Sequence, residues 1–487
     1  MAKRKHSSRA PQARHGKKSQ ASRHDKRDRL ARRNRRRRRT HAAKVPLTGG
    51  IAQLAGRMAG LLDARHGFRL PIVLAGAMLA GSRRTASRWF RAAGVADDWD
   101  RFYDLLCSIG KHAASLMMPL LMLLVRRFDP GPNGRWKIAI DDSPTKRFGR
   151  HVEAANVHHH PTPGPADGPW LYGHNWVCLA LLMTHSLWGT LALPVLSKLY
   201  VRRDDVKNLK SRYNWNFHTK HELALQLIQQ VTRCLRALGS QAGFLIVVDG
   251  AYAARPFLYP LVTAGIHVVS RLRCNAKLFD LPPKQDGQRG RPRKYGKNRI
   301  SLATLAGRQD GWQIVTYTCR GIAVTRRCKS FLATTKLTSG VIRVVLLEHE
   351  RGNWAAYFSS DVEMDVNAIL ETVSARWAIE EHFHDVKEVW GAGQQQVRNV
   401  WSNIGCWHLN TWLYTMVELE SWDLSASELV DRSDRSWDNP SRRPSHADRR
   451  RRIIRKMLEK QYLNDLPRGT NGRKYRARIV ELLGLAA

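Results

Sequence analysis

Acidic residues are scarce in this sequence, and the motifs of several common enzyme classes are missing. The 487 residues include 82 Lys and Arg but only 40 Asp and Glu, which gives a net charge of +42. This excess favours a polyanionic partner, most often nucleic acid, with an anionic membrane surface as the alternative. Neither a G-x-x-x-x-G-K-[ST] motif nor a G-x-S-x-G motif occurs. The sequence therefore gives no support for nucleotide-driven motion or for serine hydrolysis.

Long apolar runs and paired cysteines are also missing. The best membrane candidate, residues 113–125, contains Pro119 and is shorter than the ~20 residues that a transmembrane helix needs, so we expect a buried core helix there. The N-terminus lacks the apolar stretch of a secretory signal. Seven cysteines occur without any C-x-x-C pair. We therefore expect reduced thiols in a cytoplasmic protein, with neither a disulfide framework nor a zinc site.

Composition divides the chain into four parts. Residues 1–45 are rich in Arg and Lys without an apolar period, which predicts a disordered basic arm, either one that binds DNA non-specifically or a solvated leader. Residues 46–130 have apolar residues at helical spacing and predict a helical domain. It is a candidate for DNA binding, although no clear helix-turn-helix pattern is present. Residues 134–422 form the main domain, and residues 423–487 form a polar, basic C-terminal region.

Strand-like runs and helical segments alternate within the main domain. Apolar runs of strand type lie at residues 136–140, 176–185, 191–201, 244–252 and 267–273. Together with an amphipathic helix over residues 220–238, these runs predict an α/β sheet with helices on its faces. A series of further β-runs predicts a β-rich insertion over about residues 275–360.

Two carboxylates follow buried strands in this pattern. Asp141 comes directly after the run "WKIAI", and Asp249 ends the run "FLIVVD". In open α/β sheets the ligand crevice lies outside such strand ends, although Asp is also a common turn residue. The repeated placement favours a shared site at the edge of the sheet.

A helix expected over residues 375–387, "ARWAIEEHFHDVK", adds a third carboxylate. At about 100° per residue, Arg376, Glu380 and Lys387 share one face, so that one anion stands between two cations. One interpretation is a solvated face with i,i+4 ion pairs. In the other, Glu380 joins the two aspartates around two Mg²⁺ ions, which suit carboxylate ligands and phosphodiester hydrolysis. Arg376 and Lys387 would then be available to contact phosphates.

These motifs, in the order strand–Asp, strand–Asp and helix–Glu, resemble those of the DDE transposases. The resemblance is closest to the insertion-sequence branch with the signature Y-x2-R-x3-E-x6-K, which Arg376, Glu380 and Lys387 match. Val373 stands in the place of the tyrosine. The segment "VVDGAY" resembles the second-Asp motif of that branch.

The first-Asp motif of the branch resembles "IDDSPTKRFG", because the Asp is shortly followed by Ser or Thr. On this pattern Asp141 with Ser143 is the better candidate, and Asp142 is the reserve. The resemblance implies that the first Asp, Asp249 and Glu380 are the catalytic and metal-binding residues.

The resemblance also implies an RNase H-like fold and a function in DNA transposition. Water activated by Mg²⁺ would cut the ends of the element, and the freed 3′-OH would attack target DNA; Mn²⁺ is expected to substitute. The implied partners are terminal inverted repeats, target DNA and a second copy of the chain in a homodimeric DNA complex, without a membrane or a small-molecule cofactor. A bacterial, nucleoid-associated protein is expected. The alternatives are a domesticated DNA-binding relative that does not cut and an RNase H-like nuclease without strand transfer.

Two tryptophans are candidates for contacts with a DNA base. Members of the branch often pass through a hairpin intermediate in which a Trp holds a flipped base. Trp377 follows the signature Arg as an aromatic does in relatives, and Trp312 lies in the predicted insertion. Packing is the alternative role of each tryptophan.

Four basic residues complete the predicted DNA contacts. Lys146 and Arg147 lie shortly after the first Asp, near the expected path of a phosphate. Arg291 and Arg293 stand among Gly and Pro in "GQRGRPRKYGK", as minor-groove hooks do, with a solvated hairpin tip as the alternative. The His-rich segment 158–174 does not predict a zinc site, because adjacent histidines cannot all face one metal.

Overall fold

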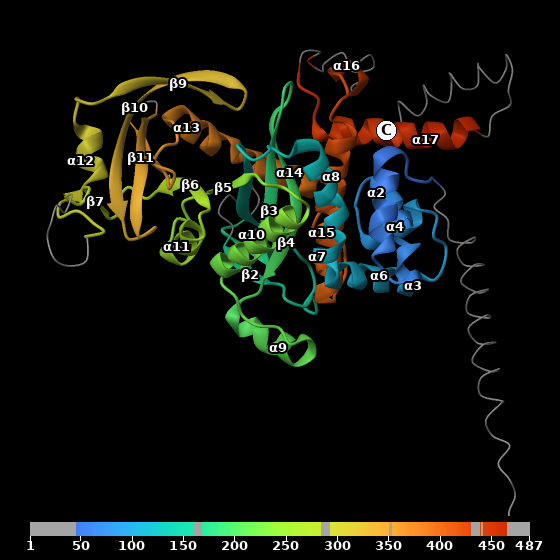
Figure 1. Ribbon diagram of the computed structural model, residues 1–487. Coiled ribbons are helices and arrows are strands. Elements are labelled where there is room, and N and C mark those ends of the chain that lie inside the picture. Colours follow the sequence, from blue (N-terminus) through green and yellow to red (C-terminus); the bar gives the residue numbers. More distant parts are fainter. Residues whose placement is uncertain are drawn as a thin grey trace, which may run out of the picture.

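The computed structural model describes residues 45–159, 168–283, 293–349, 353–429, 439 and 442–464. Figure 1 shows a group of helices at one end of this part of the chain and β-strands at the other, with a central sheet between them. Residues 1–44 of the predicted basic arm, Arg291 and part of the C-terminal region lie outside the described residues.

Helices make up the N-terminal part of the described chain. They are α2 (Gly49–Gly60), α3 (Ala64–Gly67), α4 (Leu70–Leu79), α5 (Ala86–Ala92), α6 (Trp99–Lys111), α7 (Ala113–Leu116) and α8 (Met118–Phe128). The helical spacing predicted here is confirmed, whereas the domain boundaries stay a prediction. Within the described residues no single helix is long and apolar enough to cross a bilayer. The pair of α6 with α7–α8, which is bent by 78°, passes the same test of length and composition.

Two glycines join these helices to the rest of the molecule. A Cβ on Gly110 of α6 would lie 1.9 Å from the carbonyl oxygen of Trp401 in α15 (Val400–Glu420). A Cβ on Gly405 of α15 would lie 2.0 Å from the carbonyl oxygen of Leu106. Only glycine allows such an approach, so α6 and α15 pack backbone against backbone.

The central sheet has the predicted RNase H-like arrangement. Its strands lie in the order β4 (Gly189–Tyr200), β3 (Trp170–His185), β1 (Arg135–Lys146), β5 (Gly243–Val248) and β6 (His267–Leu272). β3 pairs antiparallel with both β4 and β1, and β1, β5 and β6 pair parallel. The short strand β2 (Asn156–His159) pairs with the start of β3.

Strand β1 is longer than the sequence predicts. The apolar run was expected to end before Asp141, but the strand continues to Lys146 because it stays paired with the antiparallel strand β3. Its parallel pairing with β5 ends where Ile140 lies opposite Val248. Asp141 therefore lies inside β1, at the point where the neighbouring parallel strand stops.

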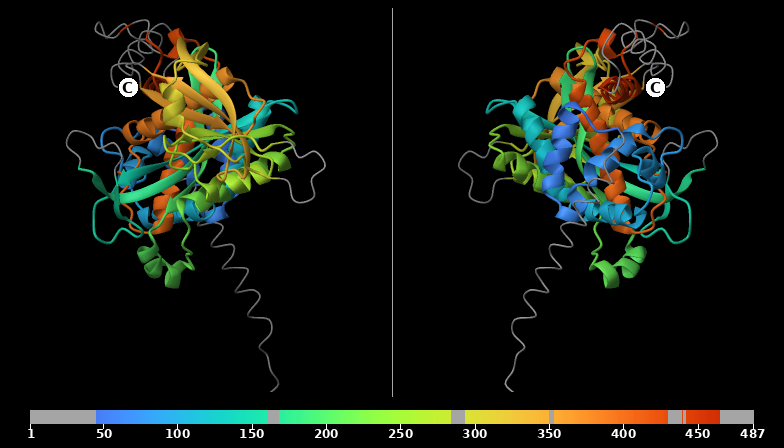
Figure 2. Two further views of the ribbon diagram at one scale, coloured as in Figure 1. Left: turned by 90° about the vertical axis from the view of Figure 1, so that its left-hand side faces the viewer. Right: turned by 90° about the vertical axis from the view of Figure 1, so that its right-hand side faces the viewer.

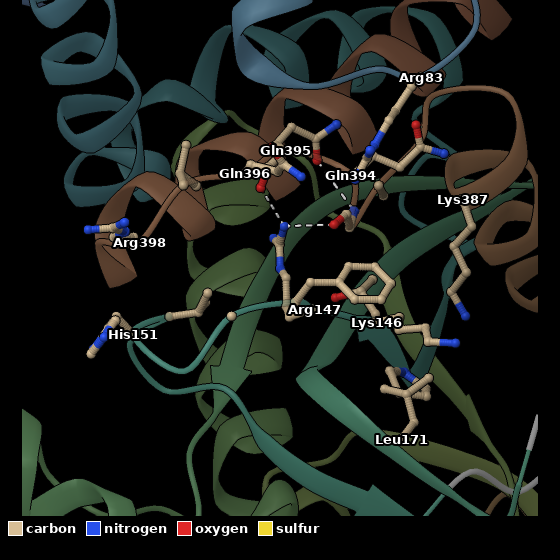
Figure 3. Close-up of a pocket in the computed structure, with 18 of the residues that line it drawn as sticks. Arg83, Lys146, Arg147, His151, Leu171, Lys387, Gln394, Gln395, Gln396 and Arg398 are labelled. Carbon is tan, nitrogen blue, oxygen red and sulfur yellow. Dashed lines mark hydrogen bonds between the residues drawn. The ribbon is translucent and has the colours of Figure 1, made fainter.

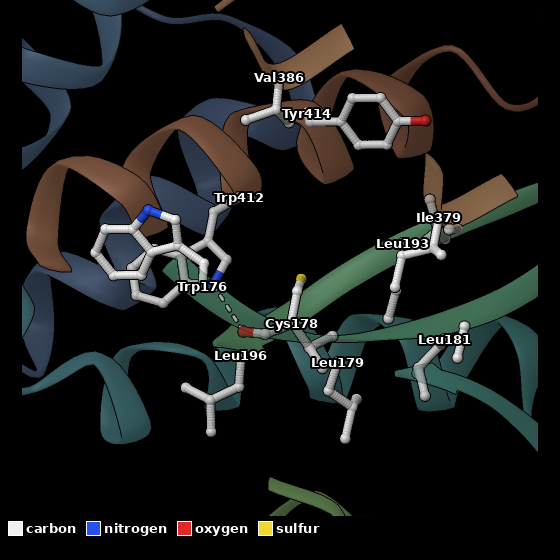
Figure 4. Close-up of a cluster of buried hydrophobic side chains, with 14 of the residues drawn as sticks. Trp176, Cys178, Leu179, Leu181, Leu193, Leu196, Ile379, Val386, Trp412 and Tyr414 are labelled. Atoms are coloured by element: carbon white, nitrogen blue, oxygen red, sulfur yellow. Dashed lines mark hydrogen bonds between the residues drawn. The ribbon is translucent and has the colours of Figure 1, made fainter. Parts of the chain in front are cut away.

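Helices cover both faces of the central sheet. α10 (Lys220–Ala237) and α11 (Arg255–Thr263) lie on one face; α14 (Trp377–Glu388) and α15 lie on the other. Trp176 of β3 stacks on Trp407 of α15, with ring centroids 4.9 Å apart. Trp412 of the same helix donates a hydrogen bond to the carbonyl oxygen of Val195 at 2.9 Å. Figure 4 shows Trp176 and Trp412 in the core between α15 and the sheet.

The predicted β-rich insertion extends the central sheet. Its elements are β7 (Leu278–Phe279), β8 (Arg299–Ile300), α12 (Leu302–Gly307), β9 (Gln313–Cys319), β10 (Ile322–Thr335), β11 (Gly340–Glu348) and β12 (Trp354–Ser359). β12 pairs antiparallel with β6, so the sheet is continuous through the insertion. In the left view of Figure 2 the insertion, in yellow and gold, faces the viewer. The remaining helices are α9 (Arg203–Tyr213), α13 (Val366–Ala375), α16 (Ala426–Leu429) and α17 (His446–Asn464).

Candidate active site

The two predicted aspartates lie on neighbouring parallel strands. Because Ile140 of β1 pairs with Val248 of β5, Asp141 and Asp249 directly follow paired residues. The carboxylate of Asp249 accepts hydrogen bonds from the backbone N–H groups of Ala251, at 3.0 Å, and Tyr252, at 3.3 Å, which fixes it at the turn after β5. The register of β1 and β5 therefore places the two carboxylates side by side, as the sequence pattern predicted.

Asp141 is half-buried among charged groups, with its side chain 16% exposed. Burial raises the pKa of its carboxyl to about 7; the negative charges of Asp249 and Asp142 add to this increase, and the positive charge of Arg376 opposes it. A carboxyl in this setting is stabilised as an anion by any additional cation nearby.

Arg376 joins Asp141 to the predicted third carboxylate. Its Nη1 lies 3.1 Å from Oδ2 of Asp141, and its Nη2 lies 2.8 Å from Oε1 of Glu380. The sequence predicted Arg376 as a free phosphate-binding cation, and this is a correction: in the described structure its guanidinium is paired with two carboxylates. The bridge brings α14 and β1 together although Asp141 and Glu380 are far apart in sequence.

Asp142 points to the opposite face of β1. Its Oδ2 lies 2.6 Å from Nζ of Lys220 in α10, and its Oδ1 accepts a hydrogen bond from the hydroxyl of Tyr252 at 3.2 Å. Successive residues of a strand alternate between faces, so only Asp141 shares a face with Glu380. The sequence did not predict roles for Lys220 or Tyr252, although Tyr252 lies within the quoted "VVDGAY" motif.

The donor chemistry of the three carboxylates fits a hard divalent cation such as Mg²⁺. Asp141, Asp249 and Glu380 supply only oxygen ligands, without Cys or His. Within the described part of the chain, however, no three His, Cys, Asp or Glu side chains are grouped closely enough to hold a metal ion. The guanidinium of Arg376 between Asp141 and Glu380 gives a physical reason, since it occupies the position from which a cation would contact both carboxylates.

A basic groove of about 900 Å³ begins where β1 ends (Figure 3). Its cationic lining comes from the α4–α5 turn, the end of β1 and the segment after it, the end of α14 and the loop before α15: Arg83, Lys146, Arg147, Arg150, Lys387 and Arg398. Burial lowers the pKa of Lys387 to about 8, and Glu388 partly opposes this decrease. Lys146 and Lys387, both predicted as DNA contacts, thus line one groove, and the sequence did not predict that Arg83 and Arg398 join them.

Arg147 is a correction to the predicted phosphate contacts. Its side chain is buried, and Nη1 donates hydrogen bonds to the carbonyl oxygens of Gly393 at 2.9 Å and Gln395 at 2.7 Å. Its Nε donates to Nδ1 of His174 at 3.1 Å. Burial lowers the pKa of Arg147 to about 10 and that of His174 to about 3. Arg147 therefore holds the loop before α15 in place, and its donors are used within the protein.

A second hollow, of about 460 Å³, lies beside the N-terminal end of α14. Trp377 lines it and is 42% exposed, with the guanidinium of Arg320 lying 4.7 Å from the centre of its ring. Lys137 of β1 and Leu187 of the β3–β4 turn line the same hollow. Trp312, by contrast, donates its Nε1–H to the carbonyl oxygen of Arg308 at 2.9 Å, which favours its alternative role in packing.

The predicted minor-groove hook cannot be placed as a whole. Arg293 is exposed between β7 and β8, whereas Arg291 lies outside the described residues. The DNA-binding role of both residues stays a prediction.

A sheet of RNase H-like order with acidic residues on adjacent strands defines an endonuclease-like catalytic core, and comparison with known proteins agrees. Residues 57–326, more than half of the chain, match the family model described as DDE superfamily endonuclease, and the chain belongs to this family. The match includes Asp141 and Asp249 and ends before Glu380. The resemblance to DDE transposases is thus confirmed at the level of the superfamily.

One solved structure with a similar chain is a piggyBac transposase synaptic complex with hairpin DNA. The comparison covers 90% of this chain and 82% of that chain, with 8% sequence identity and a TM-score of 0.37. A comparison with curated proteins gives no match.

Proposed function

We propose that the protein is a DNA transposase that cuts the ends of its element and joins them to target DNA. The observation that carries this proposal is the joining of Asp141 and Glu380 through Arg376, next to Asp249 on the adjacent strand. These three carboxylates come from the three motifs of the DDE pattern, in the same order. Membership of the DDE superfamily supports the endonuclease step.

The three carboxylates would hold Mg²⁺, and Mn²⁺ would substitute for it. A bound divalent pair supplies an activated water and stabilises the leaving oxygen of a phosphodiester. The side chains of Asp141, Asp249 and Glu380 would orient these cations against the scissile phosphate. The pKa of Asp141, which burial raises, supports the view that its anionic form needs cationic partners.

The hollows on both sides of the carboxylates suit a nucleic-acid strand. The basic groove with Lys146 and Lys387 would bind the phosphate backbone, and the hollow with Trp377 would accept an unstacked base. A homodimer in the DNA complex and a location at the bacterial nucleoid are parts of this proposal that rest on the resemblance alone.

Substitution of the carboxylates tests the proposal. Glu380→Gln and Asp249→Asn should each abolish Mg²⁺-dependent cleavage of DNA that carries the terminal inverted repeats, while binding of the same DNA stays nearly unchanged. Glu363→Gln is the matched control, because Glu363 is exposed before α13 and lines neither the basic groove nor the hollow with Trp377. Undiminished cleavage by either test variant would overturn the assignment.

Two alternatives remain distinguishable by product. A catalytically silent relative would bind the terminal repeats without cutting them. An RNase H-like nuclease would cut but would not join pre-cut 3′-OH ends to a target plasmid. Detection of joined product with wild-type protein, and its loss in Glu380→Gln, would exclude both alternatives.

A further inference from the structure

The helix pair α4–α5 presents a basic face to solvent. α4 is almost entirely buried, and Trp89 and Phe90 anchor α5 in the core. A Cβ on Gly76 of α4 would lie 2.0 Å from the carbonyl oxygen of Trp89, so the two helices approach as closely as backbones can. The opposite side of α5 carries the exposed residues Arg88 and Arg91, which share one face because they are three positions apart.

The turn between the two helices adds to this face. It comprises residues 80–85 and carries the exposed side chain of Arg83. Arg88 donates a hydrogen bond from Nη1 to Oγ of Ser82 at 2.7 Å, which holds its guanidinium over the turn. A shallow hollow of about 580 Å³ lies between the end of α4 and the arginines of α5. An exposed helix with arginine side chains that can donate hydrogen bonds, packed on a buried helix, is an arrangement that can enter a DNA major groove.

The basic groove continues from this face towards the carboxylates. Ser82 and Arg83 line one part of the groove, and Lys146 and Lys387 line another (Figure 3). A DNA backbone that follows the groove would pass from α5 to the end of β1. The surface around α5 is therefore joined to the candidate active site by positive charge.

Hydrogen bonds fix the α4–α5 turn to the end of α14, the helix that carries Glu380, and to the loop that follows it. The backbone N–H of Arg84 donates to Oε1 of Gln394 at 2.7 Å, and its carbonyl oxygen accepts from Nε2 of Gln395 at 3.0 Å. Its Nη1 donates to the carbonyl oxygen of Glu388, the last residue of α14, at 3.3 Å. Glu380 lies two turns earlier, about 12 Å along the helix axis.

From this geometry we infer that α5 reads the base sequence of the DNA, in a major groove within about one helical turn of the cut bond. Arg88 and Arg91 contact base edges, and the groove with Lys387 holds the intervening backbone. This inference rests on the proposed function, since it assigns the part of the chain that selects the DNA to be cut. The hydrogen bonds of Arg84 set the distance between the sequence that is read and the bond that is cut.

Selection from a pool of random DNA duplexes tests the reading role. The full chain is incubated with the pool in the absence of divalent cations and with competitor DNA, and the bound duplexes are sequenced. The wild type should enrich a motif, and Arg88→Ala and Arg91→Ala should each lose preference at one or two positions by about 5-fold to 150-fold. Arg57→Ala, at an exposed position of α2, is the matched control and should enrich the wild-type motif.

Three results of the selection would overturn the inference. The first is a wild-type motif that both α5 variants enrich unchanged. The second is an equal loss of affinity for all sequences, which would show that the arginines contact only phosphates. The third is enrichment of no motif by the wild type. Both substituted arginines are exposed, so thermal unfolding should confirm intact folding.

The position of the cut tests the coupling to α14. Gln394→Ala removes the acceptor for the N–H of Arg84 and should scatter the cut over neighbouring bonds, while the selected motif stays the same. Gln53→Ala, an exposed glutamine of α2, should cut at the wild-type bond. Uniform cutting by Gln394→Ala would overturn the coupling. Failure of the wild type to cut any DNA would instead count against the proposed function. The selection experiment would still test whether α5 reads the base sequence, because it measures binding without cleavage.

Discussion

Lys387 should make DNA affinity depend on pH in a range where few other groups titrate. Its ammonium lines the basic groove, and burial lowers its pKa to about 8. The titratable and charged groups around that groove come from four places. Lys146 ends β1, and Glu388 lies on the same helix as Lys387; the others are Arg83, Arg147, Arg150, His151 and Arg398 from the turns and loops. All of them except Glu388 are basic side chains, so a phosphate in the groove lies in a positive electrostatic potential.

The sign of the effect follows from the direction of the shift. Lys387 is charged below pH 8 and neutral above it, so with this pKa the charged fraction falls from about nine-tenths at pH 7 to about one-tenth at pH 9. If the charged form makes the phosphate contact, affinity should fall by up to about tenfold over this range. Folding stability should change in the opposite direction. The pKa of an unfolded Lys stays near 10.5, so between pH 8 and that value the unfolded chain binds more protons, and raising the pH favours the folded state.

The assay is fluorescence anisotropy with a labelled duplex of arbitrary sequence, without divalent cations and at constant ionic strength. Lys387→Arg should bind equally at pH 7 and pH 9, because an arginine stays charged throughout. Lys387→Ala should bind more weakly at pH 7, lose the pH dependence and lower the slope of log affinity against log salt by about 1. Lys111→Ala, an exposed lysine of α6 outside the groove, is the control. Equal affinity of the wild type at both pH values, or an equally steep fall in Lys387→Arg, would refute the reasoning.

Three further substitutions probe packing and base contact. Arg147→Lys cannot reproduce the hydrogen bonds to Gly393, Gln395 and His174, so it should lower the free energy of unfolding by ~1–3 kcal/mol in a denaturant titration; a lower salt slope of DNA binding at unchanged stability would contradict this structural role. Gly405→Ala should destabilise by a similar ~1–3 kcal/mol because its Cβ meets the carbonyl oxygen of Leu106, whereas Gly56→Ala in α2 meets nothing within 4 Å and should not; equal melting temperatures for the two variants would count against the proposed crossing. Trp377→Ala should weaken binding of DNA with an unpaired base by ~1–3 kcal/mol more than binding of a fully paired duplex, and Trp377→Phe should retain most of the difference; an equal effect on both DNAs would favour its role in packing.

The fold and the placement of the carboxylates in it could be predicted from local patterns, and their partners could not. Apolar runs that end in Asp141 and Asp249 predicted adjacent strands, because parallel strands of one sheet place their ends together. Helical periodicity placed Arg376 and Glu380 on one face. The length of β1 could not be predicted, because the residues after Asp141 are polar and stay extended only through pairing with β3. The burial of Arg147 depends on a loop almost 250 residues later, with which it shares no sequence pattern.

The charged face of the helix at residues 375–387 combines both interpretations that its sequence allows. The i,i+4 pair of Arg376 and Glu380 exists, as the solvated interpretation requires. However, the same guanidinium also contacts Asp141 of the central sheet, and both side chains are largely shielded from solvent, so the pair is not a surface feature. A single arginine then leaves Asp141, Asp249 and Glu380 with an excess of negative charge in a protein whose net charge is +42. The carboxylates thus form an acidic site in a strongly basic protein, with a hollow of cationic lining on either side. This charge distribution is what a site needs to bind divalent cations and a phosphate backbone at the same place.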